Sequence, residues 1–380
     1  MSTPRKALVV TGSRAEFGLL RPVMRAIDAH PGLELLVIAA GSHLISPGLT
    51  YDDVKRDFSI ADSVPMQVAG RVGRPDDAEA VGRGISRFTR SFTGLDPDWV
   101  VVLGDRIEAF AAAAAAAIGG WPVAHLHGGD RAEGVHDEAL RHAITKLAHL
   151  HLPATAQSAQ RIIRMGEPES RVRIIGSPAV DELDAIEPLS DAEYASLGSP
   201  TVLMLMHPVG RHDEAEEWSA EAVIEALRRV GRHPAAIALH PNHDPGRRGV
   251  LRAIQAGFDP GRVLSHLPRD RFVGLLKRIR DAGGFIIGNS SSGLIESAAL
   301  RLPAVDVGER QAGRERPSNV VHAQDGDHDA IAAAIQAATA LDRSTITHPY
   351  GPGDAGRKAA DTLASVDPRS PGLLRKHNAY

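Results

Sequence analysis

Histidine and carboxylate side chains are concentrated in one segment, residues 123–151, which reads VAHLHGGDRAEGVHDEALRHAITKLAHLH. His125 and His127 alternate at the end of an apolar run, Asp130 follows a Gly-Gly turn, and further candidates follow at His136, Asp137, Glu138 and His142. Nitrogen and oxygen donors of these types bind divalent cations, and the chain has no cysteine that would replace them. Taken alone, the segment predicts a metal site.

A second stretch, GNSSSGLIE at residues 288–296, has the composition of an anion site. It follows an apolar run and is expected to open a helix, so backbone N–H groups, hydroxyls and the positive helix end would meet there. A diphosphate is the simplest ligand of Ser290, Ser291, Ser292 and Gly293, although serines at this place also serve only as helix caps. The lysine of a P-loop is missing. Glu296 could accept hydrogen bonds from a ribose or face solvent.

Further polar clusters come directly after predicted strands. They are Gly12-Ser13-Arg14, Gly104-Asp105-Arg106, His207-Pro208 and His240-Pro241-Asn242. Later, Arg310 and Arg314 flank a Gln-Ala-Gly turn, which suits bidentate binding of phosphate but is also compatible with a surface ion-pair loop. Open α/β sheets bind their ligands at the carboxyl ends of the strands, so we expect these clusters to bind one ligand together.

The elements that must place these clusters alternate between strands and helices. Apolar runs predict strands at residues 6–11, 33–40, 99–103, 123–127 and 172–175, and then at 201–206, 235–239, 263–265, 285–287 and 303–307. Helices are predicted at 21–29, where Pro22 is tolerated only in a first turn, at 50–58, 75–92 and 108–118, and from about Asp137. The pattern predicts an α/β fold of two Rossmann-like, doubly wound parallel-sheet domains facing across a cleft.

Residues 186–200 carry prolines, serines and charges with little apolar periodicity, and they predict the domain boundary. We place an N-terminal domain at 1–187 and a C-terminal domain at 188–380, and the last helix of the second is a candidate for packing back on the first.

Composition excludes several classes of function. With 380 residues, 43% hydrophobic residues and 4% aromatic residues, the chain can fill two cores but lacks stacking platforms for nucleic acid. The net charge of −4 also argues against binding to a phosphate backbone. No apolar run is long enough for a membrane span, and the N-terminus reads as a buried strand rather than a signal peptide. We therefore expect a cytoplasmic protein with no nucleic-acid or membrane partner.

Together, the motifs resemble the UDP-N-acetylglucosamine 2-epimerase family, and most of all the hydrolysing branch of sialic and legionaminic acid biosynthesis. The resemblance runs in order from about Val9 to Asn319 and includes GSRAEFG, GDR, HLHGGDRAEGVHDEALRHAITKLAHLH, HP, HPN and GNSSSGLIESAALRLPAVDVGERQAGR. It implies two domains of the glycosyltransferase-B arrangement, with the sugar-side and acid/base residues in the first and the nucleotide bound mainly by the second. It also implies a nucleotide-sugar substrate (most simply a UDP-sugar), no metal or other cofactor, and assembly into a homodimer or homotetramer.

The resemblance also implies a reaction. A base removes the proton from C2 of the sugar while the nucleoside diphosphate leaves C1, which gives a glycal. Water then adds with inversion at C2, and the free 2-epimeric sugar leaves, as in the conversion of UDP-GlcNAc to ManNAc and UDP. Because no carbonyl acidifies the C2 proton, this needs a placed base and an electropositive phosphate site.

Family positions are carried over by motif. The catalytic set is Asp105, Asp137, His207, His127, Asp130 and Arg141, of which Asp105, Asp137 and His207 match acid/base positions. The nucleotide and phosphate set is Arg14, Arg106, His240, Asn242, Ser290, Ser291, Ser292, Gly293, Glu296, Arg310 and Arg314. Asp137 and Arg141 are separated by one helical turn, so Arg141 is expected to hold Asp137.

The chain departs from the family pattern at four positions, which leaves the substrate open. His127 fills a variable place, Asp130 replaces the usual Glu, Glu16 replaces the usual Asp, and Leu19 stands where Lys is frequent. Four alternatives remain: a non-hydrolysing 2-epimerase, a glycosyltransferase that needs an acceptor, a nucleotide-sugar sensor without turnover, and a metal-dependent hydrolase.

Overall fold

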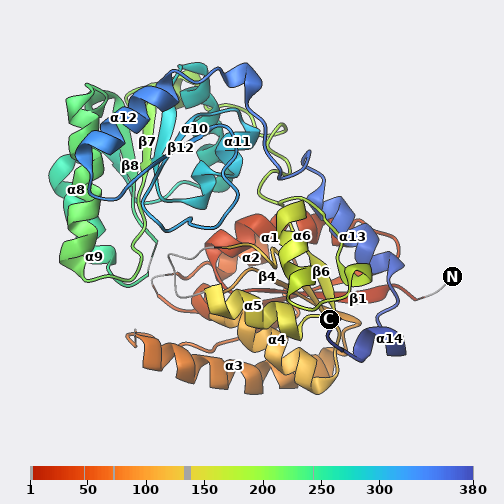
Figure 1. The fold of residues 1–380 in the computed structure, drawn as a ribbon. Coiled ribbons are helices and arrows are strands. Elements are labelled where there is room, and N and C mark those ends of the chain that lie inside the picture. Colours follow the sequence, from red (N-terminus) through yellow and green to blue (C-terminus); the bar gives the residue numbers. More distant parts are fainter. Residues whose placement is uncertain (1–2, 47, 72, 132–137, 243, 380) are drawn as a thin grey trace. The chain divides into compact units, whose positions relative to one another are not determined.

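The computed structural model describes residues 3–379 except 47, 72, 132–137 and 243. The chain divides into two compact units (Figure 1). Unit 1 contains the described residues of Met1–Asp130, Asp137–Asp181 and Gly351–Tyr380, and unit 2 contains those of Arg131–His136 and Glu182–Tyr350. Among the described residues, no helix is long and apolar enough to cross a membrane.

Unit 1 is a parallel six-stranded sheet in the order β3-β2-β1-β4-β5-β6. Its strands are β1 (Arg5–Thr11), β2 (Leu33–Ala40), β3 (Asp62–Val64), β4 (Trp99–Leu103), β5 (Val123–Leu126) and β6 (Leu150–Leu152). Its helices are α1 (Arg14–Asp28), α2 (Tyr51–Asp57), α3 (Arg74–Leu95), α4 (Ile107–Gly119), α5 (Glu138–Leu147), α6 (Ala156–Arg164), α13 (Ala355–Ser365) and α14 (Pro371–Leu374). This strand order is that of a doubly wound nucleotide-binding domain.

Both faces of the unit 1 sheet are buried, which explains why its strands read as continuous apolar runs. Leu8 and Val100 belong to the core on the side of α3 and α4, whereas Val9 and Trp99 belong to the core with α1 and α13. In the alanine run of α4, every residue from Ala111 to Ala116 is buried. Small side chains let this helix lie close to both the sheet and α3.

Two predicted elements of unit 1 were wrong in their bounds or role. The helix predicted at 21–29 begins at Arg14 instead, because Ser13 caps it by accepting a hydrogen bond from the Glu16 N–H, and Pro22 lies inside it. The segment 172–175 was predicted to close the sheet, but the closing strand is β6. Val172 makes only an isolated bridge to His151, and the Arg173 and Ile175 N–H groups donate to carbonyls of His151 and Pro153.

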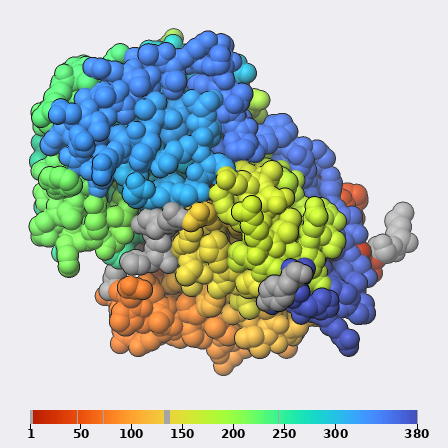
Figure 2. All heavy atoms as spheres, viewed as in Figure 1, coloured from red at the N-terminus to blue at the C-terminus, as the bar shows by residue number. Residues whose placement is uncertain are grey.

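The end of the chain returns to unit 1, where α13 packs on α1. The buried Asp181 carboxylate accepts hydrogen bonds from the N–H groups of Ala355 and Gly356, at 2.9 and 2.6 Å, and so fixes the start of α13. Figure 2 shows the dark-blue C-terminal segment against the yellow-green surface near α6, where Lys376 pairs with the buried Glu167 at 2.8 Å. The boundary predicted at 187/188 thus differs from the observed division at Asp181/Glu182 and Tyr350/Gly351.

Unit 2 repeats the topology with the order β12-β11-β10-β7-β8-β9, again parallel. Its strands are β7 (Val202–Leu205), β8 (Ala236–Leu239), β9 (Val263–Leu264), β10 (Phe285–Gly288), β11 (Ala304–Val307) and β12 (Val320–Ala323). Its helices are α7 (Asp191–Ser196), α8 (Asp213–Arg229), α9 (Arg247–Gly257), α10 (Arg269–Asp281), the four-residue α11 (Glu296–Ala299) and α12 (His328–Thr339). The predicted class of two doubly wound parallel-sheet domains is confirmed.

Candidate functional site

Four of the predicted polar clusters lie at the switch points of the two sheets, and those at His127 and His240 follow the neighbouring strands β5 and β8. In each sheet the strand order reverses at one pair of strands, which is β1 and β4 in unit 1 and β7 and β10 in unit 2. Gly12-Ser13-Arg14 and Gly104-Asp105-Arg106 follow the first pair, and His207 and Asn289 follow the second. Ligands of open α/β sheets bind outside the carboxyl ends of such pairs. The first group is the unit 1 site, and the second is the unit 2 site.

In the unit 1 site, Arg141 on α5 makes an ion pair with Asp105 through Nη2. Its Nη1 donates to the backbone carbonyl of His127 at 3.1 Å. Arg141 is 5% exposed, so the ion pair is shielded on the arginine side and its geometry is fixed. Asp137, the predicted partner of Arg141, lies outside the described residues. The contacts of Arg141 with described residues link Asp105 to the end of β5.

His127 has both ring nitrogens in hydrogen bonds with buried partners. Nδ1 donates to Asp130 Oδ2 at 2.9 Å, and Nε2 lies 3.1 Å from Ser177 Oγ. Asp130 Oδ1 accepts a second hydrogen bond, from Ser158 Oγ at 2.8 Å. His127, Asp130 and Ser177 are 5%, 3% and 0% exposed. The ring is therefore fixed at both ends.

A buried pair of glutamates lies behind the same strand ends. Glu16 Oε2 accepts a hydrogen bond from the Gly12 N–H at 2.8 Å, and Glu108 accepts from Gln67 Nε2 at 2.7 Å and Arg106 Nε at 3.3 Å. Burial and then repulsion by Glu108 raise the pKa of Glu16 to about 8. Glu16 therefore holds a proton at neutral pH, and Glu108 shares its charge with Arg106.

In the unit 2 site, Asn289 joins the loops after β7 and β10. Its Oδ1 accepts from the His207 N–H at 2.7 Å, and its Nδ2 donates to the His207 carbonyl at 2.8 Å. Its own carbonyl accepts from Arg310 Nη1 at 3.1 Å and Gln311 Nε2 at 2.9 Å. Gln311 Oε1 in turn accepts from Arg314. One asparagine thus connects the HP motif with the arginine loop.

The tautomer of His207 follows from its surroundings. Its Nδ1 accepts a hydrogen bond from the Asn242 N–H at 3.2 Å, so the ring proton lies on Nε2. Burial, and then Arg310, lower the pKa of His207 to about 3. The ring is therefore neutral near pH 7 and presents an N–H donor, which suits an anionic oxygen.

The serine-rich turn differs from the predicted helix start. Residues Ser291–Gly293 form one 3-10 turn, with Ser290 Oγ accepting from the Ser292 N–H, and the helix after it, α11, has only four residues. A helix dipole therefore contributes little here. Gly288 has φ +141°, and a Cβ there would lie 2.0 Å from the Leu205 carbonyl, so only glycine lets the turn leave the sheet at this place.

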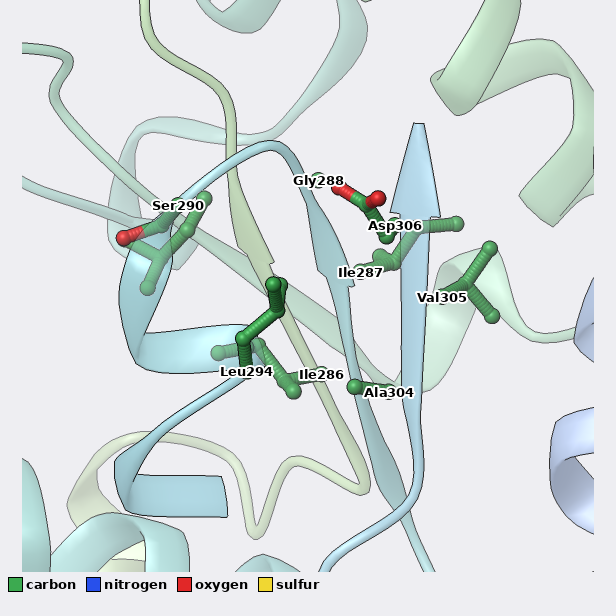
Figure 3. Close-up of a pocket in the computed structure, with 10 residues that line it drawn as sticks. Ile286, Ile287, Gly288, Ser290, Leu294, Ala304, Val305 and Asp306 are labelled. Atoms are coloured by element: carbon green, nitrogen blue, oxygen red, sulfur yellow. The ribbon is translucent and has the colours of Figure 1, made fainter. Parts of the chain in front are cut away.

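A small cavity lies under this turn (Figure 3). Ile286 and Leu294 line it, and Asp306 lies beside Gly288 at the ends of β10 and β11. Its volume is about 10 Å³, which is the space of about one water molecule. The cavity is therefore a packing void and not a substrate pocket.

Glu296 is buried at the start of α11, 6% exposed, with Arg269 Nη1 at 3.7 Å from its Oε1. The sequence left open that the Glu296 carboxylate faces solvent, and its burial contradicts that alternative. His240 is also partly buried, and burial lowers its pKa.

The metal interpretation finds no support in the histidine contacts. His125 uses both nitrogens, with Nε2 bonded to the Gly104 carbonyl at 2.8 Å and Nδ1 to Thr145 Oγ1 at 3.2 Å, and His127 is fixed as described above. In the part of the chain that the structure describes, no three His, Asp or Glu side chains group as metal ligands would. His136 and Asp137 lie outside that part.

Sequence reasoning missed several residues that organise the two sites: Ser158, Ser177, Gln67, Glu108 and the side chain of Asn289. Ser177 stands in Gly-Ser-Pro directly after the predicted strand 172–175, so its place after an apolar run was the available signal. The polar side chains of Gln67 and Ser158 have no such signal, because neither belongs to a motif nor directly follows a predicted strand.

Comparison with known proteins identifies the family. Residues 25–364 match the family model of UDP-N-acetylglucosamine 2-epimerase. The chain is 35% identical over 385 residues to the UDP-N,N'-diacetylbacillosamine 2-epimerase (hydrolyzing) of Legionella pneumophila, covering 99% of this chain and 100% of the relative. The chain belongs to the UDP-N-acetylglucosamine 2-epimerase family. The predicted family and enzyme class are confirmed.

Two further members show the spread of this family. The GDP/UDP-N,N'-diacetylbacillosamine 2-epimerase (hydrolyzing) of Campylobacter jejuni is 30% identical, with 86% of both chains covered. A UDP-GlcNAc 2-epimerase structure from Neisseria meningitidis bound to UDP-GlcNAc is 18% identical, with a TM-score of 0.75 over 94% of this chain and 99% of that one. At that identity the second likeness concerns the fold.

Proposed function

We propose that this epimerase-family enzyme hydrolyses a UDP-linked N-acetylhexosamine with inversion at C2. The observation that carries the proposal is the full-length similarity to the Legionella pneumophila enzyme, which is named as hydrolysing. The Campylobacter jejuni relative is named in the same way. The same similarity favours a sugar with acetamido groups at both C2 and C4 over UDP-GlcNAc.

The reaction has two steps whose atoms balance. In the first, a base takes the proton from C2, and the electron pair of the broken C2–H bond forms the C1=C2 double bond. The C1–O bond breaks at the same time, and its electrons leave with UDP. In the second, water gives its hydroxyl to C1 and a proton reaches C2 on the opposite face. The products are UDP and the free 2-epimeric sugar, and no cofactor is consumed.

The unit 2 site supplies groups for the leaving diphosphate. Neutral His207 donates from Nε2, and Arg310 and Arg314 carry positive charge beside the serine turn. Within the described residues, the hydroxyls of Ser291 and Ser292 make no hydrogen bond, so they can donate to phosphate oxygens. Buried Glu296 is placed to accept from ribose hydroxyls. Stabilising the charge that develops on the leaving oxygen lowers the barrier to the first step.

The unit 1 site supplies the proton chemistry. Asp105 is the carboxylate that Arg141 holds at the end of β4, and we assign it one of the two proton transfers at C2. Two faces of C2 are used, so a second acid/base group is required, and Asp137 on the segment before α5 is assigned that role. A fixed carboxylate suits this work because proton transfer depends on sub-ångström placement.

A substrate screen tests the proposal. UDP-N,N'-diacetylbacillosamine, UDP-GlcNAc and the GDP, CMP and dTDP sugars are incubated with the enzyme without any acceptor, and the nucleotides are separated by anion exchange. We expect free UDP and a free sugar in equal amounts, with the diacetamido substrate fastest. An epimerised but intact UDP-sugar would establish a non-hydrolysing enzyme, and UDP release only with an added acceptor would establish a glycosyltransferase.

We also propose that the enzyme works as a homodimer or homotetramer, as the family resemblance implies. Light scattering coupled to size exclusion measures the mass directly. A monomer of 40.4 kDa at micromolar concentration would refute this part alone.

A further inference from the structure

The backbone of His127 adopts a conformation that few side chains favour. Its φ is +58°, in the left-handed region where the Cβ atom crowds the following carbonyl. Residues held in this region need surrounding contacts that impose it, and they cluster at functional sites. His127 directly follows β5 in the unit 1 site.

Two buried partners hold the ring of His127 from opposite ends. Asp130 binds Nδ1 and is itself fixed by Ser158, whereas Ser177 binds Nε2 and is itself fixed by the Ala179 N–H at 3.2 Å. Nδ1 donates its proton to Asp130, and Nε2 is bonded to the Ser177 hydroxyl, so both ring nitrogens are occupied. The ring has no remaining atom that could exchange a proton with a sugar.

The turn after His127 has no room for adjustment. Gly129 has φ +75°, and a Cβ there would lie 2.2 Å from the Ser158 carbonyl. This close approach brings Ser158 to Asp130. An aspartate three residues after His127 reaches Nδ1 here, and the extra methylene of a glutamate would have to be accommodated between two buried groups.

The carbonyl of His127 connects this cluster to the reacting carboxylate. Arg141 Nη1 donates to that carbonyl at 3.1 Å, and Arg141 Nη2 pairs with Asp105. A left-handed backbone at His127 therefore sets where Arg141 lies, and Arg141 sets where Asp105 lies.

We propose that Ser177, His127 and Asp130 form a clamp that positions Asp105. The two partners hold the ring, the ring holds the left-handed backbone, and the backbone carbonyl holds Arg141 against Asp105. The inference rests on the proposed function, in which Asp105 acts on the sugar. It makes His127 and Asp130 positioning residues, and it adds Ser177, which no motif singled out as functional.

Substituting His127 by glycine and by alanine separates the backbone from the ring. Glycine adopts positive φ readily, whereas alanine does not. We expect His127→Ala to lower kcat for UDP release by about tenfold or more, with KM and UDP affinity unchanged, because only placement of the reacting group is lost. His127→Gly also loses the ring but keeps the left-handed backbone accessible, so it should lower kcat clearly less than His127→Ala does.

Ser177→Ala removes one end of the clamp and should lower kcat severalfold without changing KM. Ser91→Ala is the matched control, because Ser91 is also buried and donates to a carboxylate, Asp62 Oδ2, at 2.5 Å. It lies on α3 outside the site, so kcat should be unchanged.

Equal losses of kcat in the glycine and alanine variants would overturn the clamp, because the ring itself would then be needed. An alanine variant with native kcat would overturn it as well. An inactive native enzyme would refute the proposed function instead. The left-handed backbone at His127 can also be tested by melting temperature. His127→Gly should melt at a temperature at least as high as His127→Ala, because glycine adopts positive φ readily. A lower melting temperature for the glycine variant would contradict the clamp, independently of the kcat values.

Discussion

Replacing Asn289 by alanine should separate the two roles of the unit 2 site, stability and nucleotide binding. The side chain makes two short hydrogen bonds to the backbone of His207, and it is 5% exposed. Alanine leaves one N–H and one carbonyl without their partner, at about 1–3 kcal/mol for each group that water cannot reach. We expect a loss of about 2–4 kcal/mol in the free energy of unfolding.

Asn319→Ala is the control for this experiment. Asn319 is also a buried asparagine of unit 2, and its Nδ2 donates to Ser297 Oγ and the Leu302 carbonyl at 2.9 and 2.8 Å. It should lower stability by a similar amount, measured by urea unfolding followed by circular dichroism. Only Asn289→Ala should also weaken UDP binding, by about tenfold in calorimetry, because it releases His207. If Asn289→Ala bound UDP as tightly as Asn319→Ala, the proposed fixing of His207 would be wrong.

Four further substitutions test separate parts of the protein. Asp105→Asn and Asp137→Asn should each lower kcat by about 10²-fold or more while UDP affinity persists, and native turnover in both would remove the proposed chemistry. Glu296→Ala should mainly raise KM and weaken UDP binding in calorimetry, with a smaller effect on kcat. Burial raises the pKa of Glu16 to about 8 in the folded protein, whereas the pKa in the unfolded chain is the ordinary 4.5. The folded protein therefore keeps a proton on Glu16 at pH values where the unfolded chain has released it. The stability from this group is therefore complete below about pH 4.5 and is lost as the pH rises to 8, so Glu16→Gln should flatten the fall of melting temperature over that range, and an unchanged slope would contradict it.

Much of the fold was predictable because buried parallel strands leave a plain signal. The strand 99–103 was predicted with its observed bounds, since five consecutive buried apolar residues end at a Gly-Asp turn. The three-residue strands were not predicted, because β3 and β6 are too short to show a pattern. The start of α1 was missed because Pro22 argued for a later start, whereas the Ser13 cap decided it.

The site was predictable where chemistry and sequence motif coincide, and not where contacts join distant segments. Asp105 and His207 follow strands at the switch points, as their motifs indicated. Asp137, the partner expected for Arg141, lies outside the described residues, whereas the contacts of Arg141 with Asp105, which follows a different strand, and with the carbonyl of His127 were not predicted. Such pairings depend on the sheet order, which local spacing does not contain.

Hydrolysis in deuterium oxide tests the central claim most directly. The enzyme is supplied with UDP-N,N'-diacetylbacillosamine, and the products are followed by proton NMR and mass spectrometry. We predict one deuterium at C2 of the released sugar, inverted configuration at that carbon, and free UDP in step with it. Release of UDP with hydrogen retained at C2 would contradict the account, because the C2 proton would then never have left the sugar.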